Sequence, residues 1–210
     1  MPGNFDPEVF DLEGWTGEDF LNYFENVVEQ HRGVFIFCLL ISLRYAAGHV
    51  GKGSHTRVIF VAKDHGVEVW ETPEKQALTV DFSEAGVVVT PYKFSSGIWT
   101  PGRPTVNYSE LWTNRITEDQ MKNALEEVRK HLLLKGKSQM HVYNQYVILP
   151  GKTWGQNCST YAAKISRKAG FVFFMERLWG ANPLHLSRTL GLRKWATHWR
   201  MMYRISKPRE

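Results

Sequence analysis

Two capped segments of the chain place apolar residues at helical spacing. Thr16 opens a Thr-x-x-Asp pattern ahead of a run with one apolar face, which predicts a helix ending at about His31. Thr117 and Gln120 form a capping-box pattern with apolar residues on either side, and it predicts a second helix ending at about Leu134.

A third helix is predicted within WGQNCSTYAAKISRKAG, from Trp154 to Gly170. Its apolar positions recur at helical spacing, and Gly170 supplies a stop signal. The helix therefore starts at Asn157 or Cys158. This places Cys158 at a helix N-terminus.

The region between the first two helices has the alternating and β-branched composition of strands. Arg57 to Ala62, a turn at Asp64-His65-Gly66, and Val67 to Trp70 together predict a β-hairpin. Gln76 to Phe82 and Gly86 to Thr90 continue the predicted sheet. Helices before and after a group of strands indicate the α+β class.

Three further segments complete the predicted organisation. Ser95 to Pro104 is rich in glycine and proline and reads as a long loop, and His141 to Leu149 reads as a strand or an extended approach to the third helix. The apolar run Val34 to Ile41 is too short to span a bilayer and is expected in the core. We expect a single domain over 1–210, with an N-terminal helical addition over about 1–47 and a basic segment over about 186–210.

Composition agrees with one globular domain, because 43% of the 210 residues are hydrophobic. The net charge is +5, and much of the excess lies after Leu186. A basic segment of this kind can bind an anionic partner, although a solvated helix face with Trp195, Trp199 and Tyr203 packed inward also explains it. The sequence has no nucleic-acid-binding signature, so no nucleic-acid partner is expected.

The N-terminus has no basic region followed by an apolar stretch, so no Sec signal and no transmembrane segment are expected. The protein would be made in the cytoplasm, and any export would use another route.

The two cysteines lie in different surroundings. A thiolate at the N-terminus of a helix is favoured by unpaired N–H groups and by the helix dipole, so Cys158 is a candidate nucleophile. Cys38 lies in VFIFCLLI, where apolar neighbours predict a buried thiol with a raised pKa. The spacing does not exclude one disulfide. Metal-binding cysteine and histidine patterns are absent from the sequence, so we expect no metal and no cofactor.

A cysteine nucleophile needs a base, and His55 is the first candidate because it precedes the first strand of the hairpin. Glu71 follows the second hairpin strand, and a tight turn would bring it beside His55 as the group that orients the ring. His141 and His49 are the alternative bases.

The segments SHTRVIFVAKDHGVEVWE and NCSTYAAKISRKAG resemble the circularly permuted papain-like cysteine hydrolases of the YiiX-like group, from about Gly48 to Phe171. NlpC-like peptidoglycan peptidases and the lecithin:retinol acyltransferase group are wider relatives. The resemblance implies a papain-like, permuted NlpC-like fold, in which an antiparallel sheet packs against the helix that bears the nucleophile. It also implies a Cys158-His55-Glu71 triad. Candidate oxyanion or substrate contacts are Gln156, Asn157, Ser159 and Tyr143.

The function expected from the residues and the resemblance is a cysteine hydrolase, first an amidase or endopeptidase that cleaves peptidoglycan peptides. It could act as an antibacterial toxin injected by a non-Sec route into a target cell envelope, with secretion machinery and a cognate immunity protein as partners. The alternatives are a deamidase, a thioester or lipid-ester hydrolase, or a binding module that uses the basic C-terminal face.

Overall fold

The computed structural model describes residues 14–46, 49–50, 55–83, 85–94, 107–133, 157–171 and 193–194. The strands in these ranges are β1 Val34–Ala46, β2 His49–Val50, β3 His55–Lys63, β4 Ala77–Ser83, β5 Gly86–Pro91, β6 Asn107–Ile116 and β7 Arg193–Lys194. The α-helices are α1 Gly17–Gln30, α2 Glu118–Leu133 and α3 Cys158–Lys168, and the short 3₁₀ turns are η1 Val69–Glu71 and η2 Glu74–Gln76.

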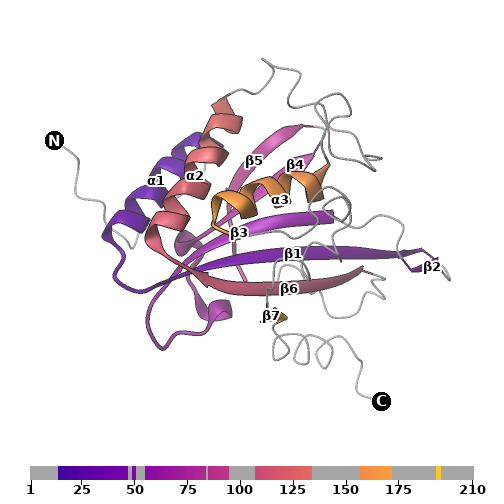
Figure 1. Cartoon of the computed structure of the whole chain (residues 1–210), viewed down its shortest axis with the longest axis horizontal. Helices are drawn as coiled ribbons and strands as arrows, with labels where there is room; N and C mark the ends of the chain where they lie inside the picture. The colour runs from indigo at the N-terminus through magenta and orange to yellow at the C-terminus, as the bar shows by residue number, and fades with distance from the viewer. Residues whose placement is uncertain are drawn as a thin grey trace.

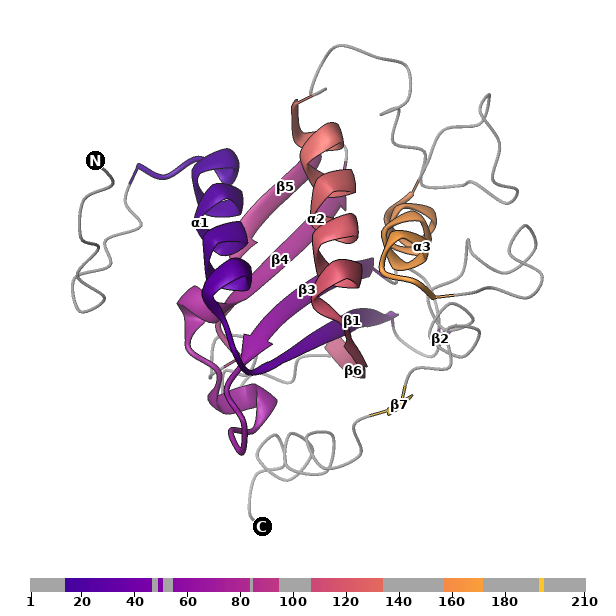
Figure 2. The ribbon, with the colours of Figure 1, turned by 60° about the vertical axis from the view of Figure 1, so that its left-hand side comes forward.

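The strands form one antiparallel sheet, and the helices cover one of its faces (Figure 1). Five long strands lie in the order β5-β4-β3-β1-β6, while the two-residue strands β7 and β2 pair with β6 and β1. Figure 2 shows α1, α2 and α3 side by side on the same face. The α+β prediction is therefore confirmed, as are the strands predicted at Gln76 to Phe82 and Gly86 to Thr90.

Both capped helices form where the sequence predicts them. Thr16 and Asp19 make a reciprocal capping box at the start of α1. Thr117 and Gln120 do the same for α2, because each side chain accepts a hydrogen bond from the other residue's backbone N–H. Each box satisfies N–H groups that the first turn of the helix leaves unpaired.

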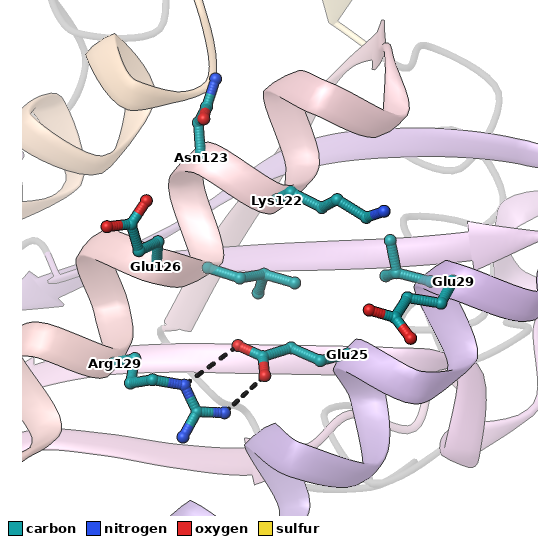
Figure 3. A pocket seen from close by; sticks show the side chains of 8 residues that line it. Glu25, Glu29, Lys122, Asn123, Glu126 and Arg129 are labelled. Atoms are coloured by element: carbon teal, nitrogen blue, oxygen red, sulfur yellow. Dashed lines mark hydrogen bonds and ion pairs between the residues drawn. The ribbon is translucent and has the colours of Figure 1, made fainter.

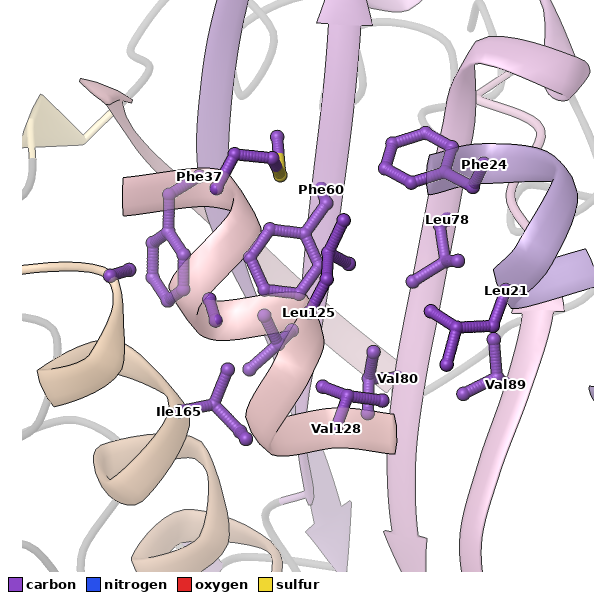
Figure 4. Close-up of a cluster of buried hydrophobic side chains, with 14 of the residues drawn as sticks. Leu21, Phe24, Phe37, Phe60, Leu78, Val80, Val89, Leu125, Val128 and Ile165 are labelled. Atoms are coloured by element: carbon purple, nitrogen blue, oxygen red, sulfur yellow. The ribbon is translucent and has the colours of Figure 1, made fainter. Parts of the chain in front are cut away.

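The main core lies between the helices and the sheet (Figure 4). Alternate residues of the central strands, among them Phe37 and Phe60, point towards α2 and α3, where they meet Leu125 and Ile165. The other set of alternate residues forms a second apolar cluster on the opposite face of the sheet, and Cys38 belongs to it. Strands buried on both faces read as continuous apolar runs, which explains the sequence VFIFCLLI.

β1 corrects the predicted N-terminal addition. This strand lies between β3 and β6, and α1 contributes Phe20, Leu21, Phe24 and Val28 to the main core. The segment from residue 17 to residue 46 is therefore integral to the domain.

The predicted hairpin is correct in its first strand and its turn and wrong in its second strand. Val67 N–H donates to the Asp64 carbonyl, and Gly66 adopts a φ of +80°. The chain then forms η1 and η2, and the next strand to pair with β3 is β4. The stretch Val67 to Trp70 has strand-like residues, but Lys63 donates to the Val67 carbonyl and holds the chain in a turn.

Several predictions fall outside the described residues: the loop at Ser95 to Pro104, the extended segment at His141 to Leu149 and most of the basic segment after residue 186. Of that segment, Arg193 and Lys194 pair with Thr113 and Trp112 as β7. Among the described helices, none is both long enough and apolar enough to cross a membrane.

Candidate active site

Cys158 is the first residue of α3, as the sequence predicts. Asn157 is the N-cap, and its side chain accepts a hydrogen bond from the Thr160 N–H at 2.9 Å. The Thr160 hydroxyl accepts from the Asn157 N–H in return, also at 2.9 Å. At the other end, Gly170 adopts a left-handed φ of +85°. The cysteine therefore lies at the start of a helix with defined caps at both ends, and at this start the helix dipole favours an anion.

The start of β3 brings a histidine and a carboxylate to this cysteine. Val58 pairs with Val80 in the β3–β4 ladder, so one step further along the ladder position 57 lies opposite position 81. His55, two residues before Arg57, is then a diagonal neighbour of Asp81. Its Nε2–H donates to Asp81 Oδ1 at 2.6 Å.

The surroundings of His55 stabilise its protonated form. The hydrogen bond to Asp81 raises the pKa of His55 most, and the hydrogen bond to Cys158 raises it further, to about 9, although burial opposes both. The pKa of Asp81 is lowered: burial works against ionisation, but the hydrogen bond and charge of His55 and the charge of Arg57 outweigh it. Asp81 is thus an ionised partner for an imidazolium.

The pKa of Cys158 is shifted in the opposite direction from that of an ordinary buried thiol. Burial alone would raise its pKa, but the hydrogen bond and charge of His55, the Thr56 backbone N–H and the Ser159 hydroxyl together lower it. The Ser159 and Thr56 hydroxyl oxygens lie 3.2 Å apart, which fastens the first turn of α3 to β3. A thiolate–imidazolium pair is the arrangement these contacts favour.

Cys38 supplies the contrast that the sequence predicts. Its side chain is fully buried on the sheet face opposite the helices, and burial strongly raises the pKa of its thiol. Both cysteines are free, so the disulfide that the spacing allowed is absent.

The structure brings Asp81, and not Glu71, to the predicted base. Glu71 lies in η1, beyond the Lys63 end of β3, whereas His55 begins that strand. The Glu71 carboxylate accepts a hydrogen bond from the Glu68 N–H. The predicted role rested on a two-stranded hairpin that does not form, and the carboxylate that contacts His55 is Asp81.

Asp81 was missed because its partner strand was misassigned. The signal was present in the sequence, since Asp81 is the lone charged residue within the strand ALTVDFS. Pairing that strand directly with RVIFVA would have placed it beside Arg57.

The structure describes some of the other residues that the sequence predicts at the site and not others. Asn157 uses its side-chain oxygen for the helix cap, and the buried Ser159 contacts Thr56 and lies 4.0 Å from the Cys158 sulfur. His49 lies in β2, where its backbone pairs with Ala46 of β1. Gln156, Tyr143 and His141 lie outside the described residues.

A buried polar cluster holds the cysteine helix against α2. The ring of Tyr161, one turn after Cys158, stacks on Phe82. The Tyr161 hydroxyl oxygen lies 3.1 Å from Nδ1 of His131. Lys164 donates to His131 Nε2 at 2.7 Å and pairs with Glu127 at 3.1 Å. These contacts restrict rotation of α3 and so help to fix the cysteine that begins it.

A hollow of about 260 Å³ lies between α1 and α2 (Figure 3). It is lined mainly by charged side chains, and Arg129 forms a two-point ion pair with Glu25 across it. Its described lining contains no cysteine and none of Cys158, His55 and Asp81. The hollow therefore is not the candidate active site.

The chain matches no family model, no curated protein and no solved structure. The resemblance to papain-like hydrolases accordingly stays a prediction. The candidate site is defined by its geometry alone.

Proposed function

We propose that this protein is a cysteine hydrolase that transfers an acyl group from an amide or ester to its own thiol and then to water. The observation that carries the proposal is the position of His55 between Asp81 and Cys158. A nucleophile, a base and a group that orients the base are the three parts that such chemistry requires.

Each residue has a definite role in the proposed reaction. The Cys158 thiolate attacks the carbonyl carbon, and the carbonyl oxygen gains negative charge, which N–H groups at the start of α3 can stabilise. The His55 imidazolium gives its proton to the leaving amine or alcohol as the bond to the carbonyl carbon breaks. Neutral His55 then takes a proton from water, which attacks the thioester and releases the acid and the thiolate. Asp81 holds the Nε2–H tautomer throughout.

The thiol itself provides the first test. The chain should be treated with iodoacetamide across a pH series, and alkylation at Cys158 and Cys38 followed separately by peptide mass spectrometry. We expect Cys158 to react at neutral pH at least about 100-fold faster than Cys38, because only a thiolate attacks the reagent. Equal, slow reaction of the two thiols would overturn the proposal.

Turnover provides the second test. Peptidoglycan peptides are the first substrate class to try, because the sequence resembles enzymes that cleave them. Release of soluble muropeptides should be compared with deamidation of glutamine peptides and with hydrolysis of thioesters and lipid esters. Cys158→Ser should remove the activity found, and the matched variant Cys38→Ala should keep it. Equal activity in Cys158→Ser and the parent would refute the role of Cys158 as the nucleophile.

A further inference from the structure

Within the part of the chain that the structure describes, Arg57 is a charged neighbour of the candidate site that the proposed reaction does not use. Its Nε–H donates to Asp81 Oδ2 at 2.9 Å, while the other oxygen of the same carboxylate accepts from His55. The two donors come from one strand, two residues apart, and the acceptor comes from the next strand. Asp81 is therefore held at both oxygens.

This geometry determines how the carboxylate is rotated. The terminal torsion of an aspartate is broad and roughly two-fold, so one hydrogen bond at one oxygen leaves the plane of the group poorly fixed. A second donor at Oδ2 fixes that plane and with it the direction of the Oδ1 lone pairs towards His55. Arginine suits the task because its donors have a rigid planar arrangement.

The ion pair is poorly placed to serve stability. The Arg57 side chain is 44% exposed and that of Asp81 22% exposed. Ion pairs with this much access to solvent contribute little to stability, because water screens the attraction and two side chains lose freedom. The effect of Arg57 that matters for the candidate site is therefore its effect on Asp81, the carboxylate that also binds His55.

We propose that Arg57 is a positioning residue that sets the orientation of Asp81 and thereby aligns the base, His55. The inference rests on the proposed function only for its effect on turnover. The alignment itself is a property of the folded chain and can be measured without any substrate.

The charge of Arg57 and its orienting role act on His55 in opposite directions. As a nearby cation, Arg57 disfavours the imidazolium, so removing the charge alone would raise the pKa of His55. As the group that aligns Asp81, Arg57 strengthens the hydrogen bond that raises this pKa, so removing it would lower the pKa. The sign of the change separates the two roles.

The test is a titration of His55 by NMR in protein labelled with ¹³C-histidine. The signal is assigned from its loss in His55→Gln. All variants carry Cys158→Ser, which removes the thiolate and makes the result independent of the nucleophile. We expect Arg57→Gln to lower the pKa of His55 towards its value in Asp81→Asn, and Arg57→Lys to give an intermediate value. Arg115→Gln, which changes an exposed arginine of β6, should leave it unchanged.

A rise or no change in the His55 pKa in Arg57→Gln would overturn the proposal. An independent check is the kinetics of p-nitrophenyl acetate hydrolysis by the parent and the Arg57 variants with Cys158 retained. Loss of alignment should lower kcat by about 10-fold or more with little change in KM, as is typical when a group that orients a catalytic residue is removed. A raised KM with unchanged kcat would instead make Arg57 a substrate contact and refute the positioning role. Failure of the parent chain to hydrolyse the ester would count against the proposed function and leave the titration result intact.

Discussion

The hydroxyl oxygens of Thr56 and Ser159 lie 3.2 Å apart, although the two residues are separated by 103 positions in the sequence. Both side chains are buried. Thr56 follows His55, and Ser159 follows Cys158, so this contact links the strand that carries the proposed base to the helix that carries the thiol.

Removing both of these hydroxyls should destabilise the protein by less than the sum of the two single changes. Thr56→Val leaves the Ser159 hydroxyl buried without this partner, which costs about 1 to 3 kcal/mol. In Thr56→Val/Ser159→Ala the unpaired group is gone, so the free energy of unfolding should fall by less than the sum of the single changes. Urea unfolding of the four proteins checks this, and strict additivity would show that the two hydroxyls do not interact.

Asp81→Asn should impair the base, whereas Glu71→Gln should not. An asparagine cannot stabilise the His55 imidazolium by charge, so turnover should fall by roughly 10- to 1,000-fold. The Glu71 carboxylate accepts a hydrogen bond from the Glu68 N–H, beyond the Lys63 end of β3, so Glu71→Gln should be a matched control with parental turnover. Steady-state kinetics on whichever substrate the protein accepts decide the matter, and the reverse pattern would restore Glu71 to the triad.

The contribution of His55 to stability should decrease with rising pH. Its pKa is raised from 6.5 to about 9 in the folded chain, so the folded state binds the proton more tightly than the unfolded state. The stabilisation is complete below about pH 6.5, the ordinary histidine value, and is lost as the pH rises through about 9. Each pKa unit corresponds to about 1.4 kcal/mol, so the full effect is a few kcal/mol.

Unfolding of the parent and of His55→Gln should therefore be compared at several pH values. The difference in the free energy of unfolding should shrink between about pH 6.5 and pH 9. A difference that stays constant over this range would show that His55 does not carry a raised pKa.

Gly170→Ala should destabilise the protein more than Gly66→Ala. Both glycines have a positive φ, of +85° and +80°, where an added Cβ is strained by about 1 kcal/mol or more. At Gly66 the Cβ would meet open space, but at Gly170 it would lie 2.3 Å from Nε2 of Gln120. Gln120 caps α2, so its displacement adds a cost. Thermal or urea unfolding of the two variants gives the comparison, and an equal loss would show that Gln120 moves freely.

Local chemistry in the sequence determined the three helices and the first turn after β3. Thr16, Thr117 and Asn157 each cap a helix through side chains within three residues, and such contacts are encoded by short patterns. The same locality placed Cys158 at a helix start, and the apolar neighbours of Cys38 were enough to predict its burial.

Only the tertiary structure decided the third member of the site. The choice between Glu71 and Asp81 depends on which strand pairs with β3, and that pairing depends on contacts between segments some 20 residues apart in sequence. Residue type and periodicity do not specify the partner or register of a strand, because both follow from how the apolar faces of all the strands pack together. The Asp81 contacts with His55 and Arg57 exist because that packing fixed one register.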